Sequence, residues 1–166
     1  MLLSHHQWFS GVDDGDYPKP AQQIKSYFQE QEFVWLWGHE HRQAIYYQHT
    51  DSGTQLSAHC RCIGHGGMPV EMPPAKSPDN RVEYWDGLTG IHPERFQTLP
   101  DGTQIAMNGY AQMTIQGNTL TLEYRDADGT LALKESFTPG GDAVWDGILT
   151  RTVLADPQLL NRLIWE

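Results

Sequence analysis

The stretch that decides the fold is Phe33–Trp37, which reads FVWLW and is stopped by Gly38. A continuous apolar run closed by a glycine is typical of a strand that is buried on both faces, as in the sheets of α/β proteins. Met1–Ser4 (MLLS) is a second short apolar run at the start of the chain. We expect a short buried strand there as well.

The segment between these two runs predicts one helix. A polar, turn-rich loop precedes Pro20, which sits where the first turn of a helix tolerates proline. Over residues 21–30, apolar side chains then recur at helical spacing, at Ile24, Tyr27 and Phe28. The order strand, helix, strand indicates one βαβ unit with a parallel pair of strands, and hence an α/β fold.

Short strands and a long loop follow. We expect strands at Ala44–Tyr47 and Ser57–Ile63, and then a loop rich in glycine and proline over residues 64–80. The loop opens with Gly64–Gly67 (GHGG), which would let the backbone approach a ligand closely because glycine lacks Cβ. An ordinary tight turn explains the same residues equally well.

The last part of the chain has the pattern of a β-meander. Polar and apolar residues alternate from Gln104 onward, and turn sequences occur at Gln116–Asn118 and Asp126–Gly129. A short helix is expected at Asp156–Leu163, with Asp156 as its N-cap and proline at the first helical position.

Composition excludes several classes of protein. The chain has 166 residues, enough for one domain with a sizeable core, and 39% of them are hydrophobic. A formal net charge of −10 argues against a nucleic-acid binder, because the phosphate backbone would repel the protein. No apolar run approaches the roughly 18 residues of a membrane span, and the first residues do not read as a signal peptide. We therefore expect a cytoplasmic protein without membrane attachment.

The two cysteines, Cys60 and Cys62, form a C-x-C pair. On a strand, both thiols would point to the same face about 7 Å apart, which is poor geometry for a mutual disulfide. Two cysteines are also too few for a disulfide scaffold. We expect reduced thiols that face the core.

Histidines follow both strands of the predicted parallel pair. His5 and His6 come directly after the first strand, and His39 and His41 follow the second. Ligands gather beyond the carboxyl ends of parallel strands in an open α/β sheet. If the two strands are neighbours, His5, His39 and His41 converge on one spot, and imidazoles bind Zn, Fe or Mn well near neutral pH. His6 would then donate a hydrogen bond to a metal ligand or to a substrate.

Other histidine motifs do not fit the chain. Gln43 stands where a zincin H-E-x-x-H would need a histidine, and the P-C-x-x-C of zinc deaminases is absent. We interpret His49, His59 and His92 as ordinary surface or core imidazoles.

The residues around these histidines resemble the C-terminal half of the calcineurin-like metallophosphoesterases, in particular bacterial members. LLSHHQ at 2–7 resembles a strand that ends in a metal-binding histidine, and WLWGHEHR at 35–42 resembles the later G-H-x-H. The resemblance extends over residues 1–69, including CIGHGGMP at 62–69, and more loosely over 108–137. It implies a β-sandwich flanked by helices that ends in an antiparallel β-meander.

The resemblance also implies a site. Carried over by position, His5 and His39 would bind one divalent ion and His41 a second one, with Mn, Fe or Zn as the metals. His6, His65 and Arg42 would lie beside the ligands or the substrate, a phosphate mono- or diester. The single domain (1–166) would then comprise a metal-ligand portion, an irregular loop segment and a β-meander with a short helix, at 1–69, 70–103 and 104–166.

The carboxylate motifs of that family, D-x-H, G-D-x-x-D and G-N-H-D/E, do not occur in this chain. Two divalent ions ~3.5–4 Å apart repel each other strongly, and a shared carboxylate normally offsets that repulsion. Three neutral histidines cannot supply the bridge, so no catalytic site is complete and we expect the isolated chain to be inactive, or nearly so. Three explanations stay open: a longer protein whose start is missing, which we favour, an N-terminal partner chain, or a degenerate relative.

Two functions other than catalysis stay open. A non-catalytic metal-binding or interaction domain would use the histidines as a mononuclear zinc site, which has the same ligand count. A structural β-domain would pair with another chain, or with a copy of itself, through an exposed sheet edge. Metal stoichiometry distinguishes the first function from an enzyme, and sedimentation tests the second.

Overall fold

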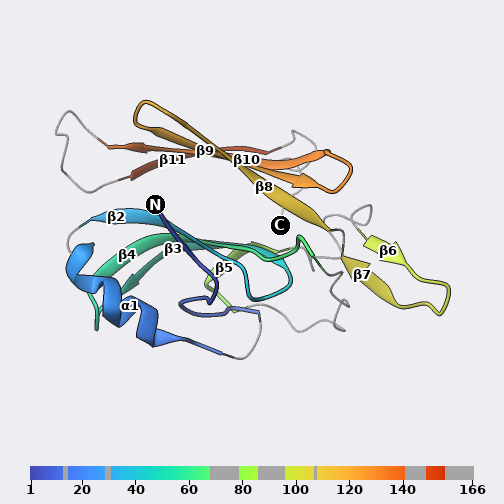
Figure 1. Cartoon of the computed structure of the whole chain (residues 1–166), viewed down its shortest axis with the longest axis horizontal. Coiled ribbons are helices and arrows are strands. Elements are labelled where there is room, and N and C mark those ends of the chain that lie inside the picture. The colour runs from blue at the N-terminus through green and yellow to red at the C-terminus, as the bar shows by residue number, and fades with distance from the viewer. Residues whose placement is uncertain are drawn as a thin grey trace.

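A computed structural model of the chain describes residues 1–12, 15–28, 31–67, 79–85, 96–106, 108–140 and 149–155. Most of these residues lie in β-strands, accompanied by one short α-helix. Two sheets lie face to face like a sandwich, and the helix lies on the outer face of one of them (Figure 1). The fold is therefore mostly β, with less helix than the predicted α/β class implies.

The first sheet has mixed strand directions and contains the predicted parallel pair. Its strands, in spatial order, are β1 (Leu2–Ser4), β2 (Glu32–Trp37), β4 (Leu56–Ile63), β3 (Gln43–Asp51) and β5 (Val82–Trp85). β1 is parallel to β2 and β2 is parallel to β4, whereas β3 runs antiparallel to both of its neighbours. The predicted strand, helix, strand order with a parallel pair is thus confirmed.

The helix begins and ends earlier than predicted. α1 spans Pro18–Ile24 and is followed by a 3₁₀ turn at Lys25–Tyr27. A 3₁₀ turn has about three residues per turn instead of 3.6, so it breaks the spacing on which the prediction rested. Ile24 and Phe28 pack against the core as expected, but Tyr27 is 79% exposed.

The second sheet is the predicted antiparallel meander. Its strands, in spatial order, are β11 (Leu149–Ala155), β10 (Leu131–Pro139), β9 (Thr119–Asp126) and β8 (Gly109–Gln116). A two-residue turn joins β8 to β9, and Gly117 in that turn has a φ of 58°, which glycine adopts without strain. Both predicted turns lie between the expected strands.

The segment that we predicted to be irregular, 70–103, contains two strands. β5 pairs with β3, and β6 (Phe96–Thr98) forms a hairpin with β7 (Gln104–Ala106). Strands this short carry too little pattern to be recognised in a sequence, because their partner strands rather than their own residues determine them. The helix predicted at 156–163 lies outside the described residues.

The strand β2 is buried on both faces, and each face belongs to a different hydrophobic core. Its odd-numbered residues pack with α1 and with the loop before it, including Trp8 and Phe9. Its even-numbered residues, Val34 and Leu36, face the second sheet and pack with side chains such as Leu122. This double burial explains the continuous apolar run that marks the strand in the sequence.

A buried ion pair connects the two sheets. Arg61 on β4 donates to both carboxylate oxygens of Glu135 on β10, at 2.8 and 2.6 Å, and both side chains are fully buried. The Tyr124 hydroxyl donates to the same carboxylate at 2.9 Å, and Arg151 on β11 also contacts it. Burial by itself would raise the pKa of Glu135, but the charge and hydrogen bonds of Arg61 lower that pKa to about 2.

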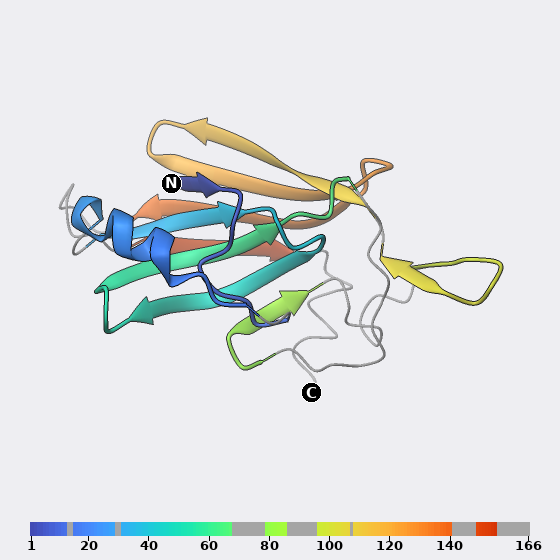
Figure 2. The same ribbon diagram turned by 60° about the horizontal axis from the view of Figure 1, so that its bottom comes forward.

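The two long sides of the sandwich differ. At one side lie β5 and β11, where Arg151 donates to Glu83 across the sheets at 2.6 Å. At the other side lie the edge strands β1 and β8 (Figure 2). Met1, which precedes β1, and Ile115 on β8 line one pocket there. We call these the closed side (β5 and β11) and the open side (β1 and β8). The prediction that the first strand is buried was wrong, because β1 is an edge strand and Leu3 is 55% exposed.

Candidate metal centre

Parallel pairing of β1 and β2 brings predicted site residues together. The two strands stay in register up to their last residues, so both end at the same edge of the first sheet. The backbone N–H of Gly38 donates to the carbonyl of His5 at 3.2 Å, which links the two strand ends. His5 and His6 follow one strand and His39 follows the other, so their imidazoles meet beyond the carboxyl ends of the strands.

The ring nitrogens of these histidines lie at distances that suit a shared metal ion. His39 Nδ1 is 3.3 Å from His5 Nε2. His5, His6 and His39 each offer a ring nitrogen, and these atoms all lie within 4.8 Å of one another. Two nitrogens that bind one zinc ion at about 2.0–2.1 Å in a tetrahedral site are about 3.3 Å apart. The His5–His39 pair therefore has the separation that a shared ion requires.

His39 has an uncommon backbone conformation. Its φ is 36°, in the left-handed region that residues other than glycine rarely adopt and that is often occupied at functional sites. Partial removal from water, followed by the charges of His6 and His5, lowers the pKa of the His39 imidazole below its ordinary value. Neutral imidazole is the form that binds a metal, so the lowered pKa favours metal binding near neutral pH.

Cys62 lies beneath the loop that carries His39. Its thiol sulfur is 3.1 Å from the carbonyl oxygen of Arg42 and 3.4 Å from that of Glu40. Cys60 and Cys62 are both free and buried, and both belong to the core around α1, as predicted. The thiol of Cys62 is thus a donor toward the backbone of the loop that carries His39.

Gly64 packs directly against the same loop. Its N–H donates to the carbonyl of Arg42 at 3.0 Å. A Cβ on Gly64 would lie 1.9 Å from the carbonyl oxygen of Glu40, a distance at which the two backbone segments would have to separate. The glycine at this position is explained by the close approach of two parts of the protein backbone, without any ligand.

The other predicted site residues are placed differently from the histidine group. His41 is exposed, and it is not among the described residues whose ligand atoms lie within 4.8 Å of one another. Arg42 is buried, and its carbonyl accepts the contacts from β4 described above. His65 is buried and packs against Gly109, where a Cβ would lie 2.7 Å from its Nε2. His6, which we predicted to lie beside the ligands, is a member of the group itself.

Tyr17 is a neighbour of the group to which sequence reasoning gave no role. Its ring stacks on that of His6, with centroids 5.1 Å apart and an interplanar angle of 22°. Its place in the loop between β1 and α1, close to the first histidines, is a sequence signal that could have identified it. Trp8, the other aromatic residue in that loop, lies in the core and stacks on Trp35.

The carboxylate of the G-H-E-H sequence does not belong to the histidine group. Glu40 is buried, and its negative charge adds to burial in raising the pKa of Tyr46. Within the described part of the chain, the group of ligand atoms around His39 consists of imidazoles alone. These residues fit a borderline metal such as zinc, for which imidazole is a preferred ligand.

The histidines that we interpreted as ordinary core or surface residues lie elsewhere. His49 contacts the rings of Trp8 and Phe9. His59 is buried against Phe137, and burial, followed by the charge of Arg61, lowers its pKa to about 4. His92 lies outside the described residues.

Comparisons with known proteins complete the description. No helix among the described residues has the length and apolar character needed to cross a membrane. A comparison of the chain with models of known protein families found no match, and neither did a comparison with curated proteins.

Proposed function

We propose that this chain supplies the histidine ligands of a metal-dependent phosphoesterase, an enzyme that hydrolyses phosphate mono- or diesters with a metal-bound hydroxide. The observation that carries the proposal is the 3.3 Å separation of His5 Nε2 and His39 Nδ1 at the carboxyl ends of two parallel strands. The resemblance of residues 1–69 to the metallophosphoesterases, which includes His5 and His39, supports the same assignment.

In the proposed site, His5 and His39 hold one divalent ion and His41 reaches a second one. The metals would be zinc, iron or manganese, and they would stabilise the negative charge that develops on the phosphate. The position of His41 outside the group of close ligand atoms is compatible with a role at a different ion. His6, with Tyr17 stacked on it, would orient a ligand or contact the ester.

Hydrolysis in this proposal requires carboxylates that come from outside residues 1–166. Two ions held by histidines alone would repel each other without a bridging anion. The chain by itself is therefore expected to bind metal and oxyanions while hydrolysing esters slowly or not at all. A longer form of the protein or a partner chain would supply the carboxylates.

Titration with zinc tests the proposal at its first step. Isothermal titration calorimetry at neutral pH should give about one tight zinc ion per chain in the wild type, and His39→Ala should lose it. His49→Ala is the matched control, since it removes an imidazole that lies away from the group, and it should bind zinc as the wild type does. Equal zinc binding by His39→Ala and wild type would contradict the proposed site.

Oxyanion binding tests the phosphoesterase part. Tungstate, a tetrahedral analogue of phosphate, should bind the zinc-loaded chain and should not bind the metal-free chain, because the ion supplies the positive charge. Tungstate binding that is unchanged by zinc, or absent in both forms, would count against a phosphate ester as the substrate.

A non-catalytic zinc-binding domain is the second candidate. The three imidazoles within 4.8 Å of one another favour it, because they complete a three-histidine set around one ion without His41. The two candidate functions predict different effects of the His6→Ala and His41→Ala variants on zinc binding. Loss of the zinc ion in His6→Ala but not in His41→Ala would favour the single-ion domain. Retention of that ion in both variants would favour the two-ion enzyme, in which His5 and His39 hold it.

A further inference from the structure

The open side of the sandwich presents two unpaired strand edges close together. β1 is the last strand of the first sheet and β8 is the last strand of the second. Among the residues that the structure describes, neither strand has a partner on its outer edge. An edge strand presents a row of backbone N–H and C=O groups that another strand can pair with.

The inner face of β8 extends beyond the first sheet. Antiparallel register places Met113 opposite Leu122 and Ile115 opposite Leu120, so all four side chains lie on the same face of the sheet. Leu122 is fully buried in the core between the sheets, yet Met113 is 39% exposed and Ile115 is 69% exposed. The residues of β8 thus point toward the layer of the first sheet at a position where that layer has ended.

Among the described residues, the first sheet has no strand that covers Met113 and Ile115. Leu3 pairs with Leu36, which faces the second sheet, so Leu3 faces the same way and is 55% exposed. β1 is also shorter than β2, because Leu2 is opposite Trp35 and the first residues of β2 extend past the start of β1. The free space in the first sheet is therefore beside β1 and beneath β8.

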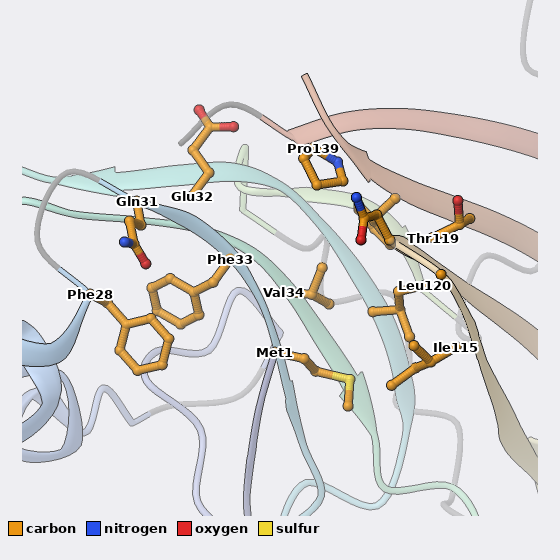
Figure 3. A pocket seen from close by; sticks show the side chains of 13 residues that line it. Met1, Phe28, Gln31, Glu32, Phe33, Val34, Ile115, Thr119, Leu120 and Pro139 are labelled. Atoms are coloured by element: carbon orange, nitrogen blue, oxygen red, sulfur yellow. The ribbon is translucent and has the colours of Figure 1, made fainter. Parts of the chain in front are cut away.

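A pocket lies at this place. It has a volume of about 290 Å³, and its lining includes Met1, Val34, Ile115, Leu120 and Phe137. Figure 3 shows the side chains of Met1, Val34, Ile115 and Leu120 directed toward one another between the two sheets. The pocket is continuous with the exposed apolar residues of the open side, since Ile115 belongs to both.

Neither edge of the open side carries a charged residue. β1 reads LLS and β8 reads GYAQMTIQ. Exposed edges of natural sheets are usually protected by lysines, other charges or proline, which prevent pairing with another chain. Strand β5 on the closed side carries Glu83 and strand β11 carries Arg151. Uncharged edges are expected where a further strand covers them.

We propose that the open side binds an extended segment of a partner polypeptide, which adds to the free edge of β1 as a further strand beneath β8. Backbone hydrogen bonds to β1 would hold the segment in the plane of the first sheet. Every second side chain would point toward Met113 and Ile115, so these positions in the partner are apolar. The intervening side chains would be neutral or basic, because this chain has a net charge of −10.

The same charge disfavours a second copy of the chain as the occupant. Two copies would bring together surfaces that each carry a formal charge of −10, and neither β1 edge contributes a basic residue to offset it. The open side is also a separate feature from the metal centre, so strand binding does not require a metal.

A model peptide tests the proposal. The probe is a fluorescent peptide of roughly eight residues, a usual strand length, in which valine and lysine alternate. A matched peptide carries N-methyl groups on alternate residues, which remove the backbone donors of one edge and leave the side chains in place. We expect the first peptide to bind at least tenfold more tightly than the second, and to slow hydrogen exchange of the β1 amides.

Variants of the protein locate the binding surface. Ile115→Asp should weaken binding of the unmodified peptide at least tenfold, because it places a charge where the partner's apolar side chains lie. Leu131→Asp is the matched control, since Leu131 is also exposed but lies at the start of β10, and it should bind as the wild type does. Circular dichroism of each variant shows that the fold is retained.

Three outcomes would overturn the proposal. The first is equal binding of the normal and N-methylated peptides, which would indicate apolar contact without strand pairing. The second is unchanged peptide binding by Ile115→Asp. The third is a dimer in sedimentation whose formation alone protects the β1 amides, which would identify a second copy as the occupant.

Discussion

The two stacked sheets end at both the closed side and the open side of the sandwich. The residues at these two ends differ in kind. On the closed side, Arg151 bridges β11 to β5 through Glu83 and also contacts the buried Glu135. On the open side, apolar residues such as Leu3 and Ile115 are left in solvent. Charges within the chain complete the closed side, and the proposed partner strand would complete the open side.

This difference indicates that the closed side contributes to stability and that the open side is the place to look for binding. Buried, paired charges fix the relative position of the two sheets on one side, since breaking such a pair is costly. The exposed apolar edge contributes little to the stability of the isolated chain, because those side chains have not left water. The histidine group follows directly after the edge strand β1, so the proposed metal site is a neighbour of the open side but shares no residue with β1 or β8.

Removal of the buried carboxylate of Glu135, which Arg151 of the closed side contacts, should have the largest effect. Glu135→Gln leaves Arg61 buried without its counter-charge, and we expect the free energy of unfolding to fall by about 3–5 kcal/mol. Urea denaturation measures this free energy of unfolding. Glu123→Gln is the control, because Glu123 also contacts two cations, Arg125 and Lys134, but at the surface. Glu123→Gln should lower the free energy of unfolding by less than about 1 kcal/mol. Equal losses of stability in the two variants would refute the role of the buried pair.

A second variant tests whether close packing against Gly64 holds the loop that carries His39. Gly64→Ala places a methyl group against the backbone of the loop that carries His39. We expect the free energy of unfolding to fall by about 1–3 kcal/mol, together with weaker zinc binding if the proposed site is correct. Gly67→Ala is the control, because a Cβ there meets open space. If thermal unfolding and zinc titration show no difference between the two variants, the loop is not held in the way described.

Acid should lower the stability of the chain through two titratable groups that lie between the sheets, His59 and Glu135. His59 has a folded-state pKa of about 4, below its ordinary value, so between pH 6.5 and 4 the unfolded chain binds a proton that the folded chain does not. Stability should therefore fall as the pH is lowered through this range. Below about pH 4.5, the lowered pKa of Glu135 continues the loss toward pH 2. Urea midpoints against pH should be flatter for His59→Gln, and an identical profile would contradict this assignment.

Loss of the bridge at the rim of the closed side should have a moderate effect. Arg151→Ala removes hydrogen bonds to two carboxylates, those of Glu83 and Glu135, and should cost about 1–3 kcal/mol. Lys134→Ala removes a surface pair to Glu123 and serves as the control, with an expected cost below about 1 kcal/mol. A smaller effect for Arg151→Ala than for the control would mean that the closed side is not held by this bridge.

Replacing an exposed apolar residue of the open side should hardly change the free energy of unfolding. Ile115→Ser should alter the free energy of unfolding by no more than about 0.5 kcal/mol, because the side chain is already in water. Leu122→Ala, on the same face of the sheet but fully buried, should cost about 2–5 kcal/mol. A large loss from Ile115→Ser would show that the residue is buried and that the open side is already covered.

Sequence reasoning was sufficient where the pattern is local. The run Phe33–Trp37 predicted a strand buried on both faces, and the glycine at 117 predicted a hairpin turn. The parallel pairing of the first two strands followed from chain order. The exposure of Leu3 could not be predicted in the same way, because it depends on β1 being an edge strand.

Long-range partners account for what the sequence did not reveal. Arg61 and Glu135 are 74 residues apart, and no local pattern joins them. The meeting of His5 and His39 was predicted, but no pattern in the sequence places His6 closer to them than His41. Which of His6 and His41 lies closer to His39 depends on the conformation of the loop after β2, in which His39 has a positive φ.

The metal centre can be tested most directly by X-ray diffraction from a zinc-soaked crystal at the zinc absorption edge. The proposed site predicts an anomalous difference peak about 2.0–2.1 Å from both His5 Nε2 and His39 Nδ1. No peak between these two nitrogens, or zinc bound at His49 or His59 instead, would contradict it.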